Sequence, residues 1–308
     1  MSTAHDHGRL TRNAALASVA TALVLLALKL YAAAVTGSVA MLGSLADTAL
    51  DLIASLVTLL GVRVAAQPAD DKHRFGHGKA EAIAALFQVI VISMSALAIG
   101  ARAISRLIAG EVTANAEYGI GVSIIALLVT FALLAYQRHV IARTRSIAIR
   151  ADNVHYQSDL LLNGAVIAAL VLDQYLGLGW IDPVFGVLIA LWLLYGAWRA
   201  STQAIDQLMD KEWPAEKRQR FLDIAARHPE FIGIHDLRTR TSGSRDFVQF
   251  HVWVSPDMTI AEAHRAMDAM EATLMAEFPD TEIIIHPDPE GHNDRLGEED
   301  EALRETPE

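Results

Sequence analysis

The stretch SLADTALDLIAS, residues 44–55, places two aspartates inside an apolar run that extends from Val39 to Val62. A run of this length can cross a bilayer as a single helix. In a helix, Asp47 and Asp51 lie about 40° apart around the axis and roughly 12 and 18 Å below the outer end of the run. Ionisable groups at that depth are costly and mark functional sites. The stretch therefore predicts a membrane helix with one acidic face.

The whole composition favours a membrane domain joined to a soluble one. The chain has 308 residues, of which 53% are hydrophobic, which is high for a soluble protein of this size. Before residue 205, six apolar stretches have roughly the length of a membrane span. The sequence from about Asp206 returns to an ordinary polar pattern. We predict an all-α membrane domain with six spans, at about 14–35, 39–62, 80–108, 118–136, 154–172 and 181–198.

Basic residues predict the orientation of these spans. Lysine and arginine accumulate in cytoplasmic loops. Here they precede the first span and lie between spans two and three and between spans four and five, whereas the loops 37–38 and 173–180 contain none. Both termini are therefore expected in the cytoplasm. The basic residues of the three predicted cytoplasmic segments are Arg9, Arg12, Arg63, Lys72, Arg74, Lys79, Arg138, Arg143, Arg145 and Arg150.

A second polar pair lies in the fifth predicted span. His155 and Asp159 have the same four-residue spacing and reach a similar depth. Four such groups would cost roughly 10–14 kcal/mol if left unpaired. A structural hydrogen-bond network with protonated aspartates is one interpretation, but the four groups include no permanent cation. A divalent cation is the better partner, because three oxygens and one nitrogen complete a tetrahedral zinc shell.

The same ligands are titratable. They must lose protons to bind a metal, and histidine titrates near physiological pH. Metal binding at such a site should therefore release protons, and proton binding should release the metal. The sequence contains no cysteine, so neither disulfides nor thiolate metal sites are available.

Four segments organise the chain. We expect a cytoplasmic leader at 1–13, the transport domain at 14–205, a soluble domain at 206–290 and an acidic, disordered tail at 291–308. The soluble domain alternates between helical and strand patterns in the order α-β-β-α-β, with helices at 216–227 and 259–278 and strands at 234–243, 245–254 and 281–287. This order predicts a small α+β domain with helices on one face of an open sheet.

Three motifs resemble the cation diffusion facilitators, and in particular the bacterial branch that exports zinc and iron. The motifs are the pair Asp47-x-x-x-Asp51, the stretch ADNVHYQSDLLLNGA around His155 and Asp159, and the loop QPADDKHRFGHGKAEAIAAL. The resemblance implies a homodimeric antiporter that exports a divalent metal from the cytoplasm in exchange for protons. Its transport site corresponds to the four residues of the two membrane pairs, and its cytoplasmic domain has a metallochaperone-like fold.

The resemblance also implies further sites. Asp70, His73 and His77 correspond to a second metal site in the loop after span two, although two histidines in a polar loop are by themselves more often only solvated. A binuclear zinc site in the soluble domain corresponds to His235, His251, His264, His286 and Asp288, and these metals would regulate transport, staple the dimer, or do both. A charged interlock between the two domains corresponds to Lys79 and Asp210.

The sequence leaves alternatives open for the transported metal and for the class of function. Zinc is the first choice, with Cd(II), Fe(II), Co(II) or Mn(II) as competitors because Asp47 makes the site harder, while His155 argues against manganese. The segment 137–153 is short and arginine-rich rather than histidine-rich, which favours a bacterial cytoplasmic membrane. A membrane-anchored metal sensor or scaffold and a passive channel are the competing functions. No motif indicates an enzyme or a nucleic-acid partner.

Overall fold

The computed structural model describes residues 3–36, 39–109, 120–176 and 181–291. The chain divides into two compact units, Met1–Ile205 and Asp206–Glu308, and each unit is described by itself. The predicted acidic tail lies, apart from Gly291, outside the described residues.

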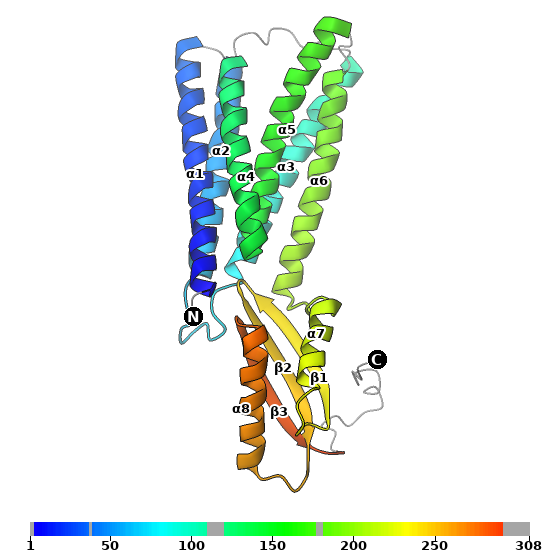
Figure 1. Cartoon of the computed structure of the whole chain (residues 1–308). Coiled ribbons are helices and arrows are strands. Elements are labelled where there is room, and N and C mark those ends of the chain that lie inside the picture. The colour runs from blue at the N-terminus through cyan, green and yellow to red at the C-terminus, as the bar shows by residue number, and fades with distance from the viewer. Residues whose placement is uncertain (1–2, 37–38, 110–119, 177–180, 292–308) are drawn as a thin grey trace. The chain divides into compact units, whose positions relative to one another are not determined.

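Long helices form the first unit (Figure 1). Five of them are long and apolar enough to cross a membrane: α1, α2, α3, α4 and α6. This count covers the described side chains alone, and those of α5 are described only up to residue 165 and at residue 168. The predicted helical membrane domain is confirmed. The bounds are α1 (Thr3–Thr36), α2 (Val39–Ala65), α3 (Ala80–Ala109), α4 (Ile120–Thr144), α5 (Ile147–Leu176) and α6 (Ile181–Leu208).

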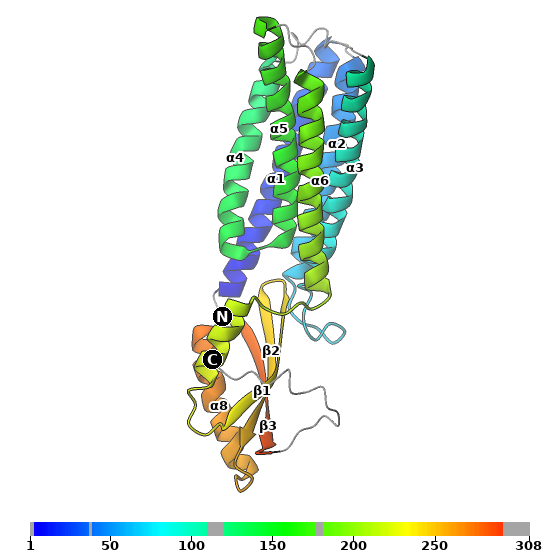
Figure 2. The same cartoon turned by 90° about the vertical axis from the view of Figure 1, so that its right-hand side faces the viewer.

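Small residues let the helices approach closely. A Cβ atom added to Gly61 on α2 would lie 2.4 Å from the Cβ of Ala84 on α3. A Cβ on Gly196 of α6 would lie 3.0 Å from a methyl carbon of Val154 on α5. Close packing at small residues replaces the hydrophobic effect as the main attraction between membrane helices. α5 packs against α2, α3 and α4, and Figure 2 shows the six helices running side by side.

The connection between α4 and α5 is much shorter than the sequence suggested. α4 ends at Thr144 and α5 begins at Ile147, so most of the segment 137–153 is helical rather than a loop. Ser146 makes this tight junction possible: its hydroxyl donates to Glu81 Oε2 over 2.6 Å and accepts from the backbone N–H of Ile149 over 3.3 Å. The second contact is an N-cap, which satisfies a free donor of the first helical turn.

The second unit is the predicted α+β domain. Its elements are α7 (Ala215–Ala225), β1 (Gly233–Ser242), β2 (Arg245–Val254), α8 (Ile260–Glu277) and β3 (Thr281–Pro289). The strand order is β1-β2-β3, with β1 antiparallel and β3 parallel to β2. The order α-β-β-α-β is confirmed, and α8 begins at a capping box of Thr259 and Glu262.

One hydrophobic core holds this unit together. Alternate residues of β2 are buried against the two helices, and their neighbours in sequence point to the opposite face of the sheet, as strand geometry requires. The helices α7 and α8 contact each other and share this core. The open face of the sheet therefore remains for polar side chains. The largest fully buried members of the core are Phe221, Phe250, Met270 and Leu274.

Candidate metal sites

Three groups of histidine and aspartate side chains gather in the described part of the chain. Each group offers three ligand atoms that lie within 4.8 Å of one another. One group lies between α2 and α5, one in the loop before α3, and one on the open face of the sheet. All three consist of residues that the sequence had singled out.

The first group, called the membrane cluster below, contains Asp51, His155 and Asp159. His155 Nε2 lies 3.0 Å from Asp51 Oδ1, and the two side chains are 3% and 20% exposed. The helix places Asp159 one turn after His155, so both face α2. Two carboxylates and one imidazole balance the charge of a divalent cation, which is what a buried site requires.

Asp47 does not belong to the membrane cluster. It lies one turn before Asp51 on α2, and its residue is exposed. The structure thus brings together three of the four residues expected at the transport site. A fourth ligand position of a tetrahedral ion would remain for Asp47 or for water.

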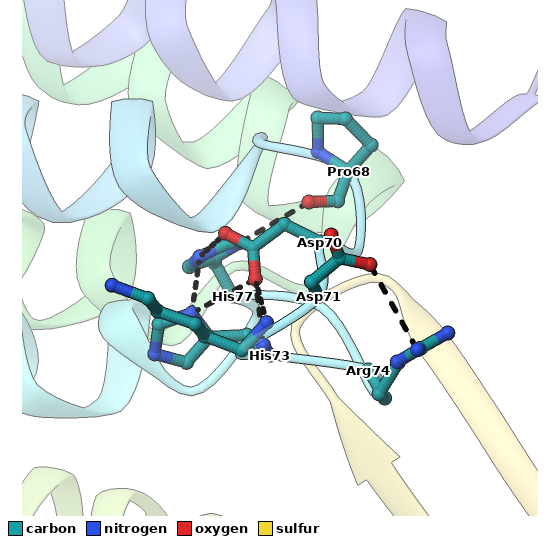
Figure 3. A network of polar contacts seen from close by, with 7 residues as sticks. Pro68, Asp70, Asp71, His73, Arg74 and His77 are labelled. Atoms are coloured by element: carbon teal, nitrogen blue, oxygen red, sulfur yellow. Dashed lines mark hydrogen bonds and ion pairs between the residues drawn. The ribbon is translucent and has the colours of Figure 1, made fainter.

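The second group, called the loop cluster, contains Asp70, His73 and His77 (Figure 3). His73 Nδ1 lies 3.2 Å from Asp70 Oδ1, and His77 Nε2 lies 3.5 Å from Asp70 Oδ2. The loop bends at Gly76, whose φ of 79° favours glycine. Asp70 and His73 are about half exposed, with side-chain values of 52% and 57%, so water can reach this group.

The backbone prepares Asp70 for a cation. The backbone N–H groups of His73 and Lys72 donate to Asp70 Oδ1 over 2.6 and 2.9 Å. These hydrogen bonds, led by that of His73, hold the pKa of the Asp70 carboxyl below its usual value. The carboxylate is therefore ionised and already oriented before any metal arrives.

The third group, called the sheet cluster, contains His235, His251 and Asp288. His251 Nδ1 lies 2.8 Å and His235 Nε2 3.2 Å from Asp288 Oδ2. The register explains the gathering, because His251 pairs with His235 on β1 and with His286 on β3. Burial lowers the pKa of His235 despite the opposing charge of Asp288, which favours the neutral, ligating imidazole.

The two remaining residues of the predicted binuclear site differ from each other. His286 Nε2 lies 3.2 Å from Asp288 Oδ1, so it adjoins the sheet cluster. His264 is on α8, on the helix-covered side of the sheet, and its side chain is 70% exposed. Its neighbour is Asp268, at 3.8 Å. Within one chain, His264 is therefore not brought to the other four residues.

The predicted interlock joins residues of different units. Lys79 precedes α3 in the first unit, and Asp210 belongs to the second, where its Oδ2 lies 3.8 Å from Arg240 Nη1. The pairing of Lys79 with Asp210 stays a prediction.

One buried polar network is not predicted by the sequence analysis. Asp152 is fully buried, and so are the side chains of Ser18, Gln88 and Gln137 around it. The signal was present, since Gln88 and Gln137 are amides within or beside apolar runs. Asp152 was missed because the segment that contains it was expected to be a cytoplasmic loop.

Apolar helices with a buried carboxylate–imidazole cluster, joined to a soluble domain with a further group of candidate metal ligands, are typical of a membrane transporter for cations. Comparison with known proteins agrees with this class. The cation efflux transmembrane domain matches residues 15–209, and the cytoplasmic domain of cation efflux proteins matches residues 213–290. The chain belongs to the cation efflux family, the cation diffusion facilitators, and is a transporter rather than an enzyme.

Relatives support this assignment along nearly the whole chain. The chain is 44% identical to the cation-efflux pump FieF of Cronobacter sakazakii over 285 residues, covering 92% of this chain and 95% of the relative. It is 43% identical to FieF of Escherichia coli K12 over 286 residues, covering 92% and 94%. A solved structure of CzrB in a zinc form is 37% identical over 28% of this chain and 99% of that one, with a TM-score of 0.26.

Proposed function

We propose that this transporter is a proton-coupled antiporter that exports a divalent metal, with zinc as its main cargo, from the cytoplasm. The membrane cluster carries the proposal. Asp51, His155 and Asp159 are held at ligand distances on two adjacent helices, and their two negative charges offset a dication. Tetrahedral coordination by mixed oxygen and nitrogen ligands suits zinc better than magnesium or calcium.

Proton coupling follows from the chemistry of the same ligands. His155 and Asp51 contact each other over 3.0 Å, so a proton can occupy the space between them when no metal does. A divalent cation must displace that proton to reach both ligands. In this scheme Asp47 completes the tetrahedral shell in the state that transfers the ion. Cadmium, ferrous iron and cobalt are cargoes of compatible chemistry.

The other two clusters take auxiliary roles in this proposal. The exposed loop cluster exchanges metal with the cytoplasm, and the sheet cluster binds zinc in the soluble domain. The match to the cytoplasmic domain of cation efflux proteins supports a homodimer, in which His264 of a second copy would complete the site on the sheet. The positive-inside distribution of lysine and arginine supports both termini in the cytoplasm. The bacterial origin of the FieF relatives supports a bacterial inner membrane.

Zinc flux into proteoliposomes tests the proposal. Purified wild type and the variant Asp51→Ala are compared with and without an imposed pH gradient. Flux that follows the proton gradient in the wild type and is lost in the variant is the expected result. Flux that ignores the gradient would indicate a channel, and equal flux in both proteins would exclude the membrane cluster as the transport site.

A further inference from the structure

A second buried carboxylate lies one helical turn before the membrane cluster. Asp152 on α5 is 0% exposed. Its carboxylate accepts hydrogen bonds from Ser18 Oγ over 2.6 Å, from Gln137 Nε2 over 2.7 Å and from Gln88 Nε2 over 2.9 Å. These donors come from α1, α4 and α3, and all three are neutral. These contacts provide hydrogen bonds to the buried carboxylate of Asp152, but they provide no positive charge that would balance it.

The polar network around Asp152 reaches every one of the first five helices. Gln88 Nε2 also donates to Thr58 Oγ1 on α2 over 3.0 Å. Asn153 Nδ2 donates to Gln137 Oε1 over 2.9 Å. Polar networks of this kind are costly in a membrane unless their groups are satisfied. In this network, Oε1 of Gln88 is the buried side-chain atom without a partner within the described residues.

Few titratable groups face Asp152. On its own helix these are His155 and the neutral phenol of Tyr156, and on α2 it is Asp51. The facing side chains of α1, α3 and α4 are the uncharged donors described above. Within the described residues, no lysine or arginine pairs with Asp152. A proton is then the simplest cation that can compensate its charge when no metal is nearby.

Gln88 provides a place for that proton. Its Oε1 is buried and has no hydrogen-bond partner within the described structure. If the amide turns over, Oε1 faces Asp152 and accepts a proton from its carboxyl group, while the Thr58 hydroxyl can donate to the same oxygen. Nε2 then takes the position without a partner. The two orientations of the Gln88 amide leave similar numbers of polar groups without a partner. Hydrogen bonding alone therefore favours neither orientation.

A metal ion in the membrane cluster would determine whether the carboxyl group of Asp152 is ionised or protonated. Asp152 and His155 are three residues apart on one helix and lie on the same face, with about 5–6 Å between their Cβ atoms. In an interior of low dielectric, a dication bound to His155 favours the ionised carboxylate of Asp152, and its departure favours the protonated one.

We propose that Asp152 is a second proton-carrying group, distinct from the metal ligands, that is deprotonated when a divalent cation occupies the membrane cluster and protonated when the cation leaves. The O–H bond of the carboxyl group breaks, the electron pair stays on the carboxylate, and the proton passes to water. The inference rests on the proposed function, because it requires the metal to bind at Asp51, His155 and Asp159.

Proton release on zinc binding tests the inference. Full-length wild type, Asp152→Asn and Gly164→Ala in detergent are titrated with zinc in weak buffer that contains a pH indicator, between about pH 6 and 8. The asparagine mimics the protonated acid, since its Nδ2 can donate to Gln88 Oε1. We expect it to release fewer protons per zinc, by up to one per chain. Gly164→Ala should keep the wild-type number, because a Cβ atom there meets nothing within 4 Å. Equal release from Asp152→Asn and wild type, or the same deficit in both variants, would overturn the inference.

Infrared difference spectra give a second measurement that does not depend on the asparagine variant. Adding zinc to the wild type should remove the band of a protonated carboxyl group. Ser18→Ala should shift that band, because the Ser18 hydroxyl contacts Asp152. A band that does not shift belongs to another acid, which would contradict the inference. Asp51→Ala separates the two hypotheses: zinc-linked proton release equal to that of the wild type would instead reject the proposed transport site.

Discussion

The membrane cluster and the loop cluster use the same two residue types in opposite settings. Asp51 and His155 are 104 residues apart in the sequence and meet in a buried site, whereas Asp70, His73 and His77 lie within eight residues of a half-exposed loop. The buried group has two carboxylates and the exposed group has one. Burial demands charge balance with a dication, while water screens the charge that remains at the loop. The membrane cluster and the loop cluster therefore differ in carboxylate number as well as in exposure.

The largest expected effect comes from Asp51→Asn. It removes a charged ligand from the membrane cluster and leaves Asp159 to hold the ion with His155. Even residues that only support metal ligands change affinity by roughly 10–100-fold, so we expect a loss of more than about 100-fold in zinc affinity at this site and transport at background level. Isothermal titration and liposome flux measure both quantities. Near-normal affinity would show that the cluster is not the buried site.

Gly61→Val tests whether the membrane cluster depends on helix packing. A side chain at Gly61 would collide with Ala84 and approach the Ala80 carbonyl to 3.1 Å, which forces α2 away from α3. We expect a loss of about 1–3 kcal/mol in stability and weaker transport, measured by thermal unfolding in detergent and by flux.

Gly164→Ala is the matched control, since a Cβ there meets nothing within 4 Å. It should be neutral or slightly stabilising, because alanine favours a helix over glycine by up to about 1 kcal/mol. If both glycine variants behave alike, close approach of α2 and α3 is not what positions the cluster.

Asp70→Asn makes the same chemical change in the exposed cluster. It should lower the number of zinc ions bound per chain by one, with little change in thermal stability, because the side chain is 52% exposed. Transport at saturating zinc should persist. The adjacent Asp71→Asn is the control: Asp71 pairs with Arg74 at 3.8 Å rather than with the histidines. Loss of transport in Asp70→Asn alone would make the loop cluster part of the obligatory path.

The smallest effect is expected from Gly76→Ala. A residue with a Cβ atom at a φ of 79° is strained, at a cost of about 1 kcal/mol. We expect a roughly fivefold loss of affinity at the loop cluster, since 1.4 kcal/mol corresponds to tenfold. Zinc titration of the full chain detects it. An affinity unchanged by this substitution would mean that the loop binds metal in a different backbone conformation from the one in Figure 3.

Sequence patterns identified what depends on local chemistry. Apolar run length located the membrane helices, alternation located the strands, and four-residue spacing indicated which faces of α2 and α5 carry ligands. The patterns did not reveal where a helix ends against a neighbour. At the junction, Ser146 contacts Glu81, which is 65 residues away in the sequence. Asp152 is buried by side chains of α1, α3 and α4, which the sequence does not place beside it.

The sequence patterns also could not predict which side chains meet in three dimensions. His235 and His251 meet because β1 and β2 pair in one particular register, which alternation alone does not specify. His264 has as good a sequence context as either of them, yet α8 carries it on the other side of the sheet. Spacing indicates a residue's face on its own element but not which elements face each other.

The polar character of α5 has a consequence for how the protein is made. Its first half carries Arg150, Asp152, His155 and Asp159. All four oppose entry of this half into lipid. A helix that enters the bilayer during synthesis cannot yet shield its polar side chains against helices that are made later. We therefore expect α5 to integrate only together with neighbouring helices that shield its polar face. The candidate metal ligands of α5 would then slow the insertion of the membrane domain.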